Sequence, residues 1–298
     1  MNRLCSGHLT AMSLLCVALA GCGAGAGGSD TTRPKATKQA DSKAQEKAKA
    51  KGKAAARVPT TPADFLDLAD KAMASEPGWT FVVTGDEALT LQGQESGASY
   101  EATVTRTGKP EALRSEGVIT SSKGVRKAEK VFVVGGTTYV KEGTAAWKKG
   151  ASTDPAMENK VEDSVAAIDA YRGYLKAGNK DVVAKKKRDT VELQVSLQPS
   201  SLKDVQGRAY VKTAVRELDS VLSQLRSAGV ATGKSQITLA RLNETLTLNA
   251  RTGRIKAHRL GFTVLVPHDG GYINYRQDVS EVNYGVFKGN ISLPVGVG

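Results

Sequence analysis

Apolar and polar residues alternate along most of the chain after residue 60, with the period of β-strands in many segments. In residues 191–197, four apolar side chains alternate with three polar ones, which is typical of a strand with one face in water. Gly135-Gly136 lies between two further runs and predicts a two-residue hairpin turn. The same reasoning predicts strands at 80–84, 100–105, 130–134, 137–141, 237–249, 255–266 and 272–282.

Three segments instead repeat apolar residues at every third or fourth position, as amphipathic helices do. The first begins after Thr61, a capping residue followed by Pro62, and it ends before Pro77. The second covers about 161–178, and the third about 202–227. A helix, strands, helices and more strands in this order predict an α+β fold, with helices packed on one face of a curved antiparallel sheet.

The N-terminus has the three parts of a secretory signal. Arg3 supplies a positive charge, residues 9–20 are largely apolar, and Leu19-Ala20-Gly21-Cys22 has the form of a lipobox. The apolar run is shorter than the about 20 residues that span a bilayer. We therefore expect residues 1–22 to be a lipoprotein signal peptide with its lipobox, and Cys22 to receive fatty acyl chains such as palmitate. The alternative is an ordinary signal peptide that is cut elsewhere.

Charge separates the next segment from the rest of the chain. Residues 31–57 hold nine Lys or Arg against two acidic residues, with no aromatic residue to build a core. Residues 23–60 are therefore predicted to be a disordered, basic, Ala/Lys-rich tether. It either binds an anionic membrane surface or wall polymer, or serves only as a solvated spacer. Nucleic acid is not an expected partner, because the basic run has no interleaved aromatic residues.

Little in the exported part, residues 61–298, points to catalysis. Its two histidines, His258 and His268, lie in different predicted elements, and it has no cysteine with which to complete a metal site. Residues 229–235 resemble a phosphate loop, but they have the wrong spacing and follow a helix. No Gly-x-Ser-x-Gly motif is present. We predict a protein that is not an enzyme and that has no cofactor and no metal.

The chain resembles the LolA/LppX/LprG-like family of exported lipoproteins, of the actinobacterial type. The resemblance lies in the order of elements, in the hairpin Val-Val-Gly-Gly-Thr-Thr-Tyr-Val-Lys (133–141) followed by Trp147, and in the ending from Val282 to Pro294. It implies a LolA-like domain over 61–298, in which a half-barrel sheet wraps around helices. Some members of this family hold acyl chains between the sheet and the helices.

Two functions remain open from these observations. The first is a membrane-anchored extracytoplasmic lipoprotein that binds a hydrophobic, lipid-like or lipoglycan ligand as a carrier or sensor. The second is a cell-surface interaction or regulatory module that has a filled core and binds an envelope protein. In the first case the expected lining residues are apolar side chains of the predicted strands: Phe81, Tyr100, Val104, Phe132, Tyr139, Leu193, Val195, Leu246, Phe262 and Val264.

Overall fold

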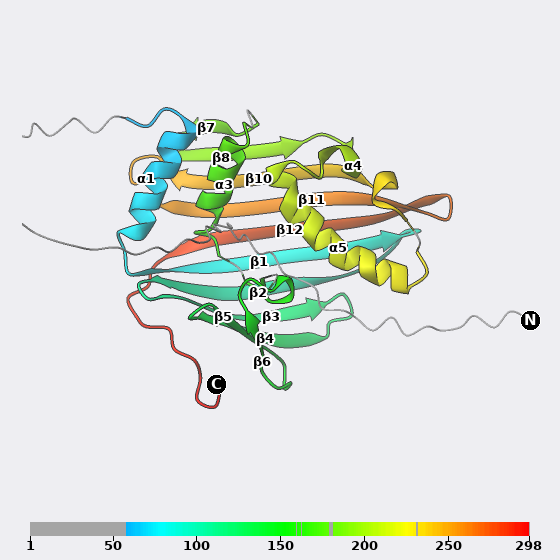
Figure 1. The fold of residues 1–298 in the computed structure, drawn as a ribbon, viewed down its shortest axis with the longest axis horizontal. Coiled ribbons are helices and arrows are strands. Elements are labelled where there is room, and N and C mark those ends of the chain that lie inside the picture. Colours follow the sequence, from blue (N-terminus) through cyan, green and yellow to red (C-terminus); the bar gives the residue numbers. More distant parts are fainter. Residues whose placement is uncertain (1–57, 159, 162, 179–180, 231, 298) are drawn as a thin grey trace, which may run out of the picture.

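The computed structural model describes residues 58–297, except 159, 162, 179–180 and 231. The predicted signal peptide, Cys22 and nearly all of the predicted tether lie outside these residues. The described part is built on one sheet of twelve strands in which all neighbours are antiparallel. Helices lie on one side of this sheet (Figure 1). The predicted α+β fold, a curved antiparallel half-barrel with helices on its concave face, is confirmed.

Two meanders meet in the middle of the sheet. The first runs outward from β1 (Gly78–Leu91), and the last strand of the second, β12 (Gly271–Val286), lies beside β1. The strand order is β6-β5-β4-β3-β2-β1-β12-β11-β10-β8-β7, with β9 paired to β10. The other strands are β2 (Gln94–Gly108), β3 (Glu111–Ser121), β4 (Arg126–Val134), β5 (Thr137–Glu142), β6 (Lys148–Ala151), β7 (Val183–Lys187), β8 (Thr190–Leu197), β9 (Ser200–Ser201), β10 (Thr238–Asn249) and β11 (Ile255–His268).

The helices cover the sheet from three places in the chain. Helix α1 (Pro62–Ala74) begins as predicted, because the Thr61 side chain and the Asp64 carboxylate form a capping box. The remaining helices are α2 (Pro155–Glu158), α3 (Ala167–Lys176), α4 (Leu202–Val205) and α5 (Lys212–Ser227), with short 3-10 turns at Ala209–Val211 and Lys234–Gln236. In Figure 1, α1, α3 and α5 all lie in front of the strands.

Two of the predicted helices are shorter in the structure. Helix α3 begins at Ala167 rather than near 161, because Asp163 accepts a hydrogen bond from the Val165 amide and binds Arg106, which holds a turn there. The predicted helix at 202–227 is divided into α4, a 3-10 turn and α5. Its interruption contains Gly207, a residue type that costs about 1 kcal/mol relative to alanine inside a helix.

Four strands have no counterpart among the predicted elements: β3, β6, β7 and the two-residue β9. Strand β7 has the sequence Val-Ala-Lys-Lys-Lys and lies at the edge of the sheet, where it buries little. Without a buried face, it has no alternation of apolar and polar residues that could reveal it. Lysines are also common on edge strands because they discourage pairing with a second chain.

The turn between β10 and β11 packs directly against α1. Gly253 has φ = +75°, and a Cβ atom there would lie 2.6 Å from Leu68 Cγ. Only glycine combines this left-handed backbone with such a close approach. This contact places α1 over the same end of the sheet as the β7–β8 turn, because the Ala250 amide donates to the carbonyl of Asp189.

Candidate functional site: the covered face of the sheet

Eight of the ten predicted lining residues lie on the face of the sheet that the helices cover. They come from five strands, and each is at most 3 % exposed. Together with side chains of α1, α3 and α5 they form one continuous apolar cluster. These eight residues, called the covered face below, are Phe81, Tyr100, Val104, Leu193, Val195, Leu246, Phe262 and Val264.

The other two predicted residues, Phe132 and Tyr139, lie on the opposite face of the sheet. They are partners across β4 and β5, and Phe132 is also opposite Arg114 of β3. The neighbour of Phe132 in sequence, Val131, points to the covered side in register with Ser115, to which Tyr100 is hydrogen-bonded. Phe132 instead packs edge-on against Trp147, with ring centroids 5.8 Å apart. The register thus corrects the prediction that these two residues line the space under the helices.

A buried polar cluster interrupts the covered face. His258 of β11 lies between two carboxylates, with Nε2 at 3.0 Å from Glu244 Oε1 and Nδ1 at 3.2 Å from Glu281 Oε1. All three side chains are at most 1 % exposed. A buried carboxylate is stable only when it is paired or hydrogen-bonded, so His258 serves as the shared cation of this Glu-His-Glu cluster.

The electrostatics of the Glu-His-Glu cluster favour a charged imidazole. Burial alone would lower the pKa of His258, but the charge of Glu281 and hydrogen bonds to Glu244 and Glu281 raise it to about 10. The cluster then carries one positive and two negative charges. The second oxygen of Glu281, Oε2, is buried without a hydrogen-bond partner in the described part of the chain.

Helix α3 covers the Glu-His-Glu cluster with two tyrosines. Tyr174 donates a hydrogen bond of 3.0 Å to Glu244 Oε2, and Tyr171 donates one of 2.9 Å to the carbonyl of Leu193. Burial and the charge of Glu244 raise the pKa of Tyr174 well above its usual value, so the hydroxyl keeps its proton and remains a donor. These bonds hold α3 to the sheet at a defined position.

A second ionic group lies where the segment after α2 meets the sheet. Lys160 Nζ is 3.1 Å from Glu129 Oε2 and 3.2 Å from Glu142 Oε1, and Lys127 also binds Glu142. Burial raises the pKa of Glu129, and the charge of Lys160 opposes this effect. This group ties the β4–β5 part of the sheet to the segment that follows α2.

The sequence does contain a signal for two members of the Glu-His-Glu cluster, namely their inward phase on the strands, although it was not used to predict the cluster. Glu244 is two residues from both Leu242 and Leu246, so it shares their inward phase on β10. Counting back from Phe262 in steps of two places His258 on the same side of β11. What the pattern does not contain is the pairing of the three strands, which brings the side chains together. Within the described residues, no group of three or more His, Cys, Asp or Glu is arranged to hold a metal ion.

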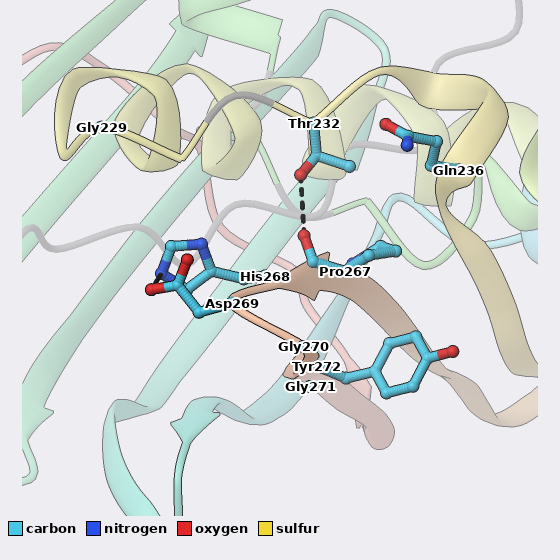
Figure 2. A pocket seen from close by; sticks show the side chains of 9 residues that line it. All are labelled: Gly229, Thr232, Gln236, Pro267, His268, Asp269, Gly270, Gly271 and Tyr272. Carbon is cyan, nitrogen blue, oxygen red and sulfur yellow. Dashed lines mark hydrogen bonds and ion pairs between the residues drawn. The ribbon is translucent and has the colours of Figure 1, made fainter.

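Two hollows lie on other surfaces of the described part, and none of the ten predicted residues lines either. One, of about 510 Å³, lies between the loop after α5 and the β11–β12 turn (Figure 2). Its polar groups bind one another: Thr232 donates a 2.8 Å hydrogen bond to the carbonyl of Pro267, and His268 is 3.2 Å from Asp269. The other, of about 680 Å³, includes Val82, Thr103 and Val118 on the outward face.

Comparison with known proteins assigns no family to the chain. No family model and no curated protein matches it. Similar solved structures include a DUF1329 family protein from Desulfovibrio piger, with 9 % identity, coverage of 80 % of this chain and 96 % of the other, and a TM-score of 0.29. A β-barrel-like DUF1849 protein from Brucella abortus has 8 % identity, coverage of 70 % and 100 %, and a TM-score of 0.25. Rv2717c from M. tuberculosis has 9 % identity, coverage of 72 % and 98 %, and a TM-score of 0.21.

At these scores the three proteins do not assign a function or a more specific family to this chain. Among the described residues, none of the helices combines the length and the apolar character needed to cross a bilayer. The covered face and its helices are therefore the features of the molecule that bear on its function.

Proposed function

We propose that the chain is a lipid-anchored extracytoplasmic lipoprotein of the LolA/LppX/LprG type, which holds a hydrophobic, lipid-like ligand between the covered face and the helices. The observation that carries this proposal is the covered face itself. Eight large apolar or aromatic side chains from five strands form one surface, and separate helices rather than a second sheet cover it. Binding sites for apolar ligands are commonly formed between such layers.

Helix α5 is the part of this cover best suited to move. It buries Leu218, Leu222 and Leu225 against the sheet. The Gln224 side chain has a buried Nε2 atom without a hydrogen-bond partner in the described part of the chain. An unsatisfied buried polar group costs about 1–3 kcal/mol, so separating α5 from the sheet costs less than separating a purely apolar helix. A ligand that replaced α5 contacts would enter beneath this helix.

A second candidate function is a cell-surface interaction or regulatory module that binds an envelope protein and no lipid. The tight packing of the covered face favours it, since all eight side chains are already buried among protein atoms. In that case the half-barrel is a filled scaffold and the outer surfaces carry the function.

Lipid content distinguishes the two functions. We expect protein purified from membranes to release about one equivalent of lipid per chain on extraction with organic solvent, measured by mass spectrometry. Returning that lipid should raise the unfolding temperature of the delipidated protein, because a ligand that binds only the folded state stabilises it. The acyl chains attached to Cys22 are covalent and remain with the protein in this extraction. An empty protein whose unfolding temperature is unchanged by lipid would instead support the interaction module.

The anchor is tested at Cys22. We expect Cys22→Ala to abolish lipidation, so that the protein is released from membranes or accumulates as an unprocessed precursor, detected by fractionation and immunoblotting. Cys16→Ala, within the predicted signal peptide, is the matched control and should leave the fractionation unchanged. A Cys22→Ala protein of mature length that stays with the membrane would contradict the lipobox assignment.

A further inference from the structure

Basic side chains gather at one corner of the sheet. Strand β7 carries Lys185, Lys186 and Lys187, and Arg188 follows at its turn. The neighbouring β10–β11 hairpin adds Arg251 at its turn and Lys256 at the start of β11, and its turn is joined to the β7–β8 turn by the hydrogen bond from Ala250 to Asp189. All six basic residues are exposed. We call these six residues the basic corner.

The acidic residues close to the basic corner offset only part of this charge. Lys187 pairs with Glu192 at 2.9 Å, and Lys256 pairs with Asp189 at 2.8 Å. In the nearby helix α1, Asp64 caps the helix and both Asp67 and Asp70 bind Arg172. The six basic residues and their two direct acidic partners together carry four positive charges, whereas residues 58–298 as a whole carry a net charge of +5.

The chain enters the described fold at the same corner. Lys186 Nζ lies 3.5 Å from the carbonyl oxygen of Pro59 and 5.4 Å from the centre of the Phe65 ring. Residue 58 is therefore next to β7, and the preceding segment, 31–57, carries nine Lys or Arg against two acidic residues. In sequence order, the proposed lipid anchor and the basic segment thus precede the point at which the described chain begins beside the basic corner.

We propose that the basic corner is a docking surface for an anionic phospholipid bilayer, and that it holds the β7 edge of the sheet against the membrane. This orientation rests on the proposed anchor at Cys22, whereas the affinity for anionic lipid does not require the anchor. A basic residue gains attraction only within about one Debye length, roughly 10 Å, of such a surface. The six residues of the basic corner lie close together where the described chain begins, so all of them can come within this distance of a membrane at once.

Vesicle binding by the unlipidated mature chain tests this surface. Residues 22–298 carrying Cys22→Ser would be measured by co-sedimentation with phosphatidylcholine vesicles, with and without one quarter phosphatidylglycerol, at about 0.1 M salt. We expect binding only to the anionic vesicles. Lys185→Gln/Lys186→Gln/Lys187→Gln/Arg188→Gln should weaken it about 30-fold, which corresponds to two basic residues at an anionic surface, since Lys186 and Lys187 also interact with the protein.

A matched variant separates position from net charge. Lys123→Gln/Arg126→Gln/Lys148→Gln/Lys149→Gln removes the same charge from exposed sites at the β3–β4 turn and at β6, on the far side of the sheet. We expect this control to bind within about threefold of the parent, and both variants to keep the unfolding temperature of the parent.

Three results would overturn the proposal: equal loss in the two variants, no binding of the parent to anionic vesicles, or binding of the parent to a soluble polyglycerol phosphate but not to vesicles. None of these results depends on whether Cys22 is lipidated, because the tested chain has no anchor. Failure of the anchor would appear separately in the fractionation of Cys22→Ala.

Discussion

Replacing His258 with leucine is expected to lower the free energy of unfolding by about 3–5 kcal/mol, the range measured when one partner of a buried ion pair is removed. The reason is that Glu244 and Glu281 would remain in the apolar layer without the cation that they share. Leucine has a similar volume, so a cavity contributes little to this loss. Urea denaturation followed by circular dichroism measures the change.

Two further variants make the result specific to the Glu-His-Glu cluster. His268→Leu removes the other histidine of the fold, which lies at an exposed turn, and should change the unfolding free energy by less than about 0.5 kcal/mol. Adding Glu244→Gln and Glu281→Leu to His258→Leu removes the unpaired charges and should recover most of the loss, while glutamine keeps an acceptor for Tyr174. A His258→Leu protein as stable as the parent would contradict a charged cluster.

The pH dependence of stability follows from the same cluster. The pKa of His258 is about 10 in the folded protein, against 6.5 for an ordinary histidine, so the folded state holds this proton more tightly than the unfolded state. Its contribution is complete below about pH 6.5 and is lost as the pH rises from there toward 10. We therefore expect the urea midpoint of the parent to fall over this interval, and that of the triple variant to fall less. If the urea midpoint changed with pH in the same way in the two proteins, the titrating group would lie outside the Glu-His-Glu cluster.

Val195→Asp is expected to destabilise the protein by about 4 kcal/mol or more. Val195 is 1 % exposed in the middle of β8, and its backbone partner in β10 is Glu244. An aspartate there would lose its hydration without gaining a cation, and it would add a negative charge opposite a carboxylate. Thermal unfolding of the purified protein, or its loss from the soluble fraction on expression, measures the effect.

Ser196→Asp is the matched control for this substitution. Ser196 follows directly in β8, points to the opposite face and is exposed. The same new charge should cost less than about 0.5 kcal/mol there. Equal effects at the two positions would show that the face assigned to β8 is wrong.

Much of the fold could be predicted because the local rules agree. The alternation at 191–197 identifies β8 and its buried side, and Gly135-Gly136 adopts the positive φ values that a two-residue hairpin turn requires. Thr61 begins α1 as expected. Two predictions failed where such agreement is lacking. Strand β7 buries too little to show alternation, and Gly207 divides a predicted helix that has one continuous apolar stripe.

The candidate site was predictable as a surface but not in its details. Eight of the ten proposed residues share the covered face because inward positions recur at every second residue of each strand. Phe132 and Tyr139 are equally apolar, and only their register with Arg114 shows that they lie on the other side. A bulge beside Ile255 shifts the phase of β11, so His258 points inward where a simple count from Ile255 would place it in water.

The sequence by itself determined the class of the fold, the position of most strands, and which positions face inward on most of those strands, since these follow from residue period and turn chemistry. Only the tertiary structure decided that β1 and β12 are neighbours, that Glu244, His258 and Glu281 meet, and that the basic strand β7 lies beside the point where the chain enters the fold. The physical reason is range. Period and turns act over a few residues, whereas these contacts join residues that are 14 or more positions apart in the chain and form only when separate elements have come together.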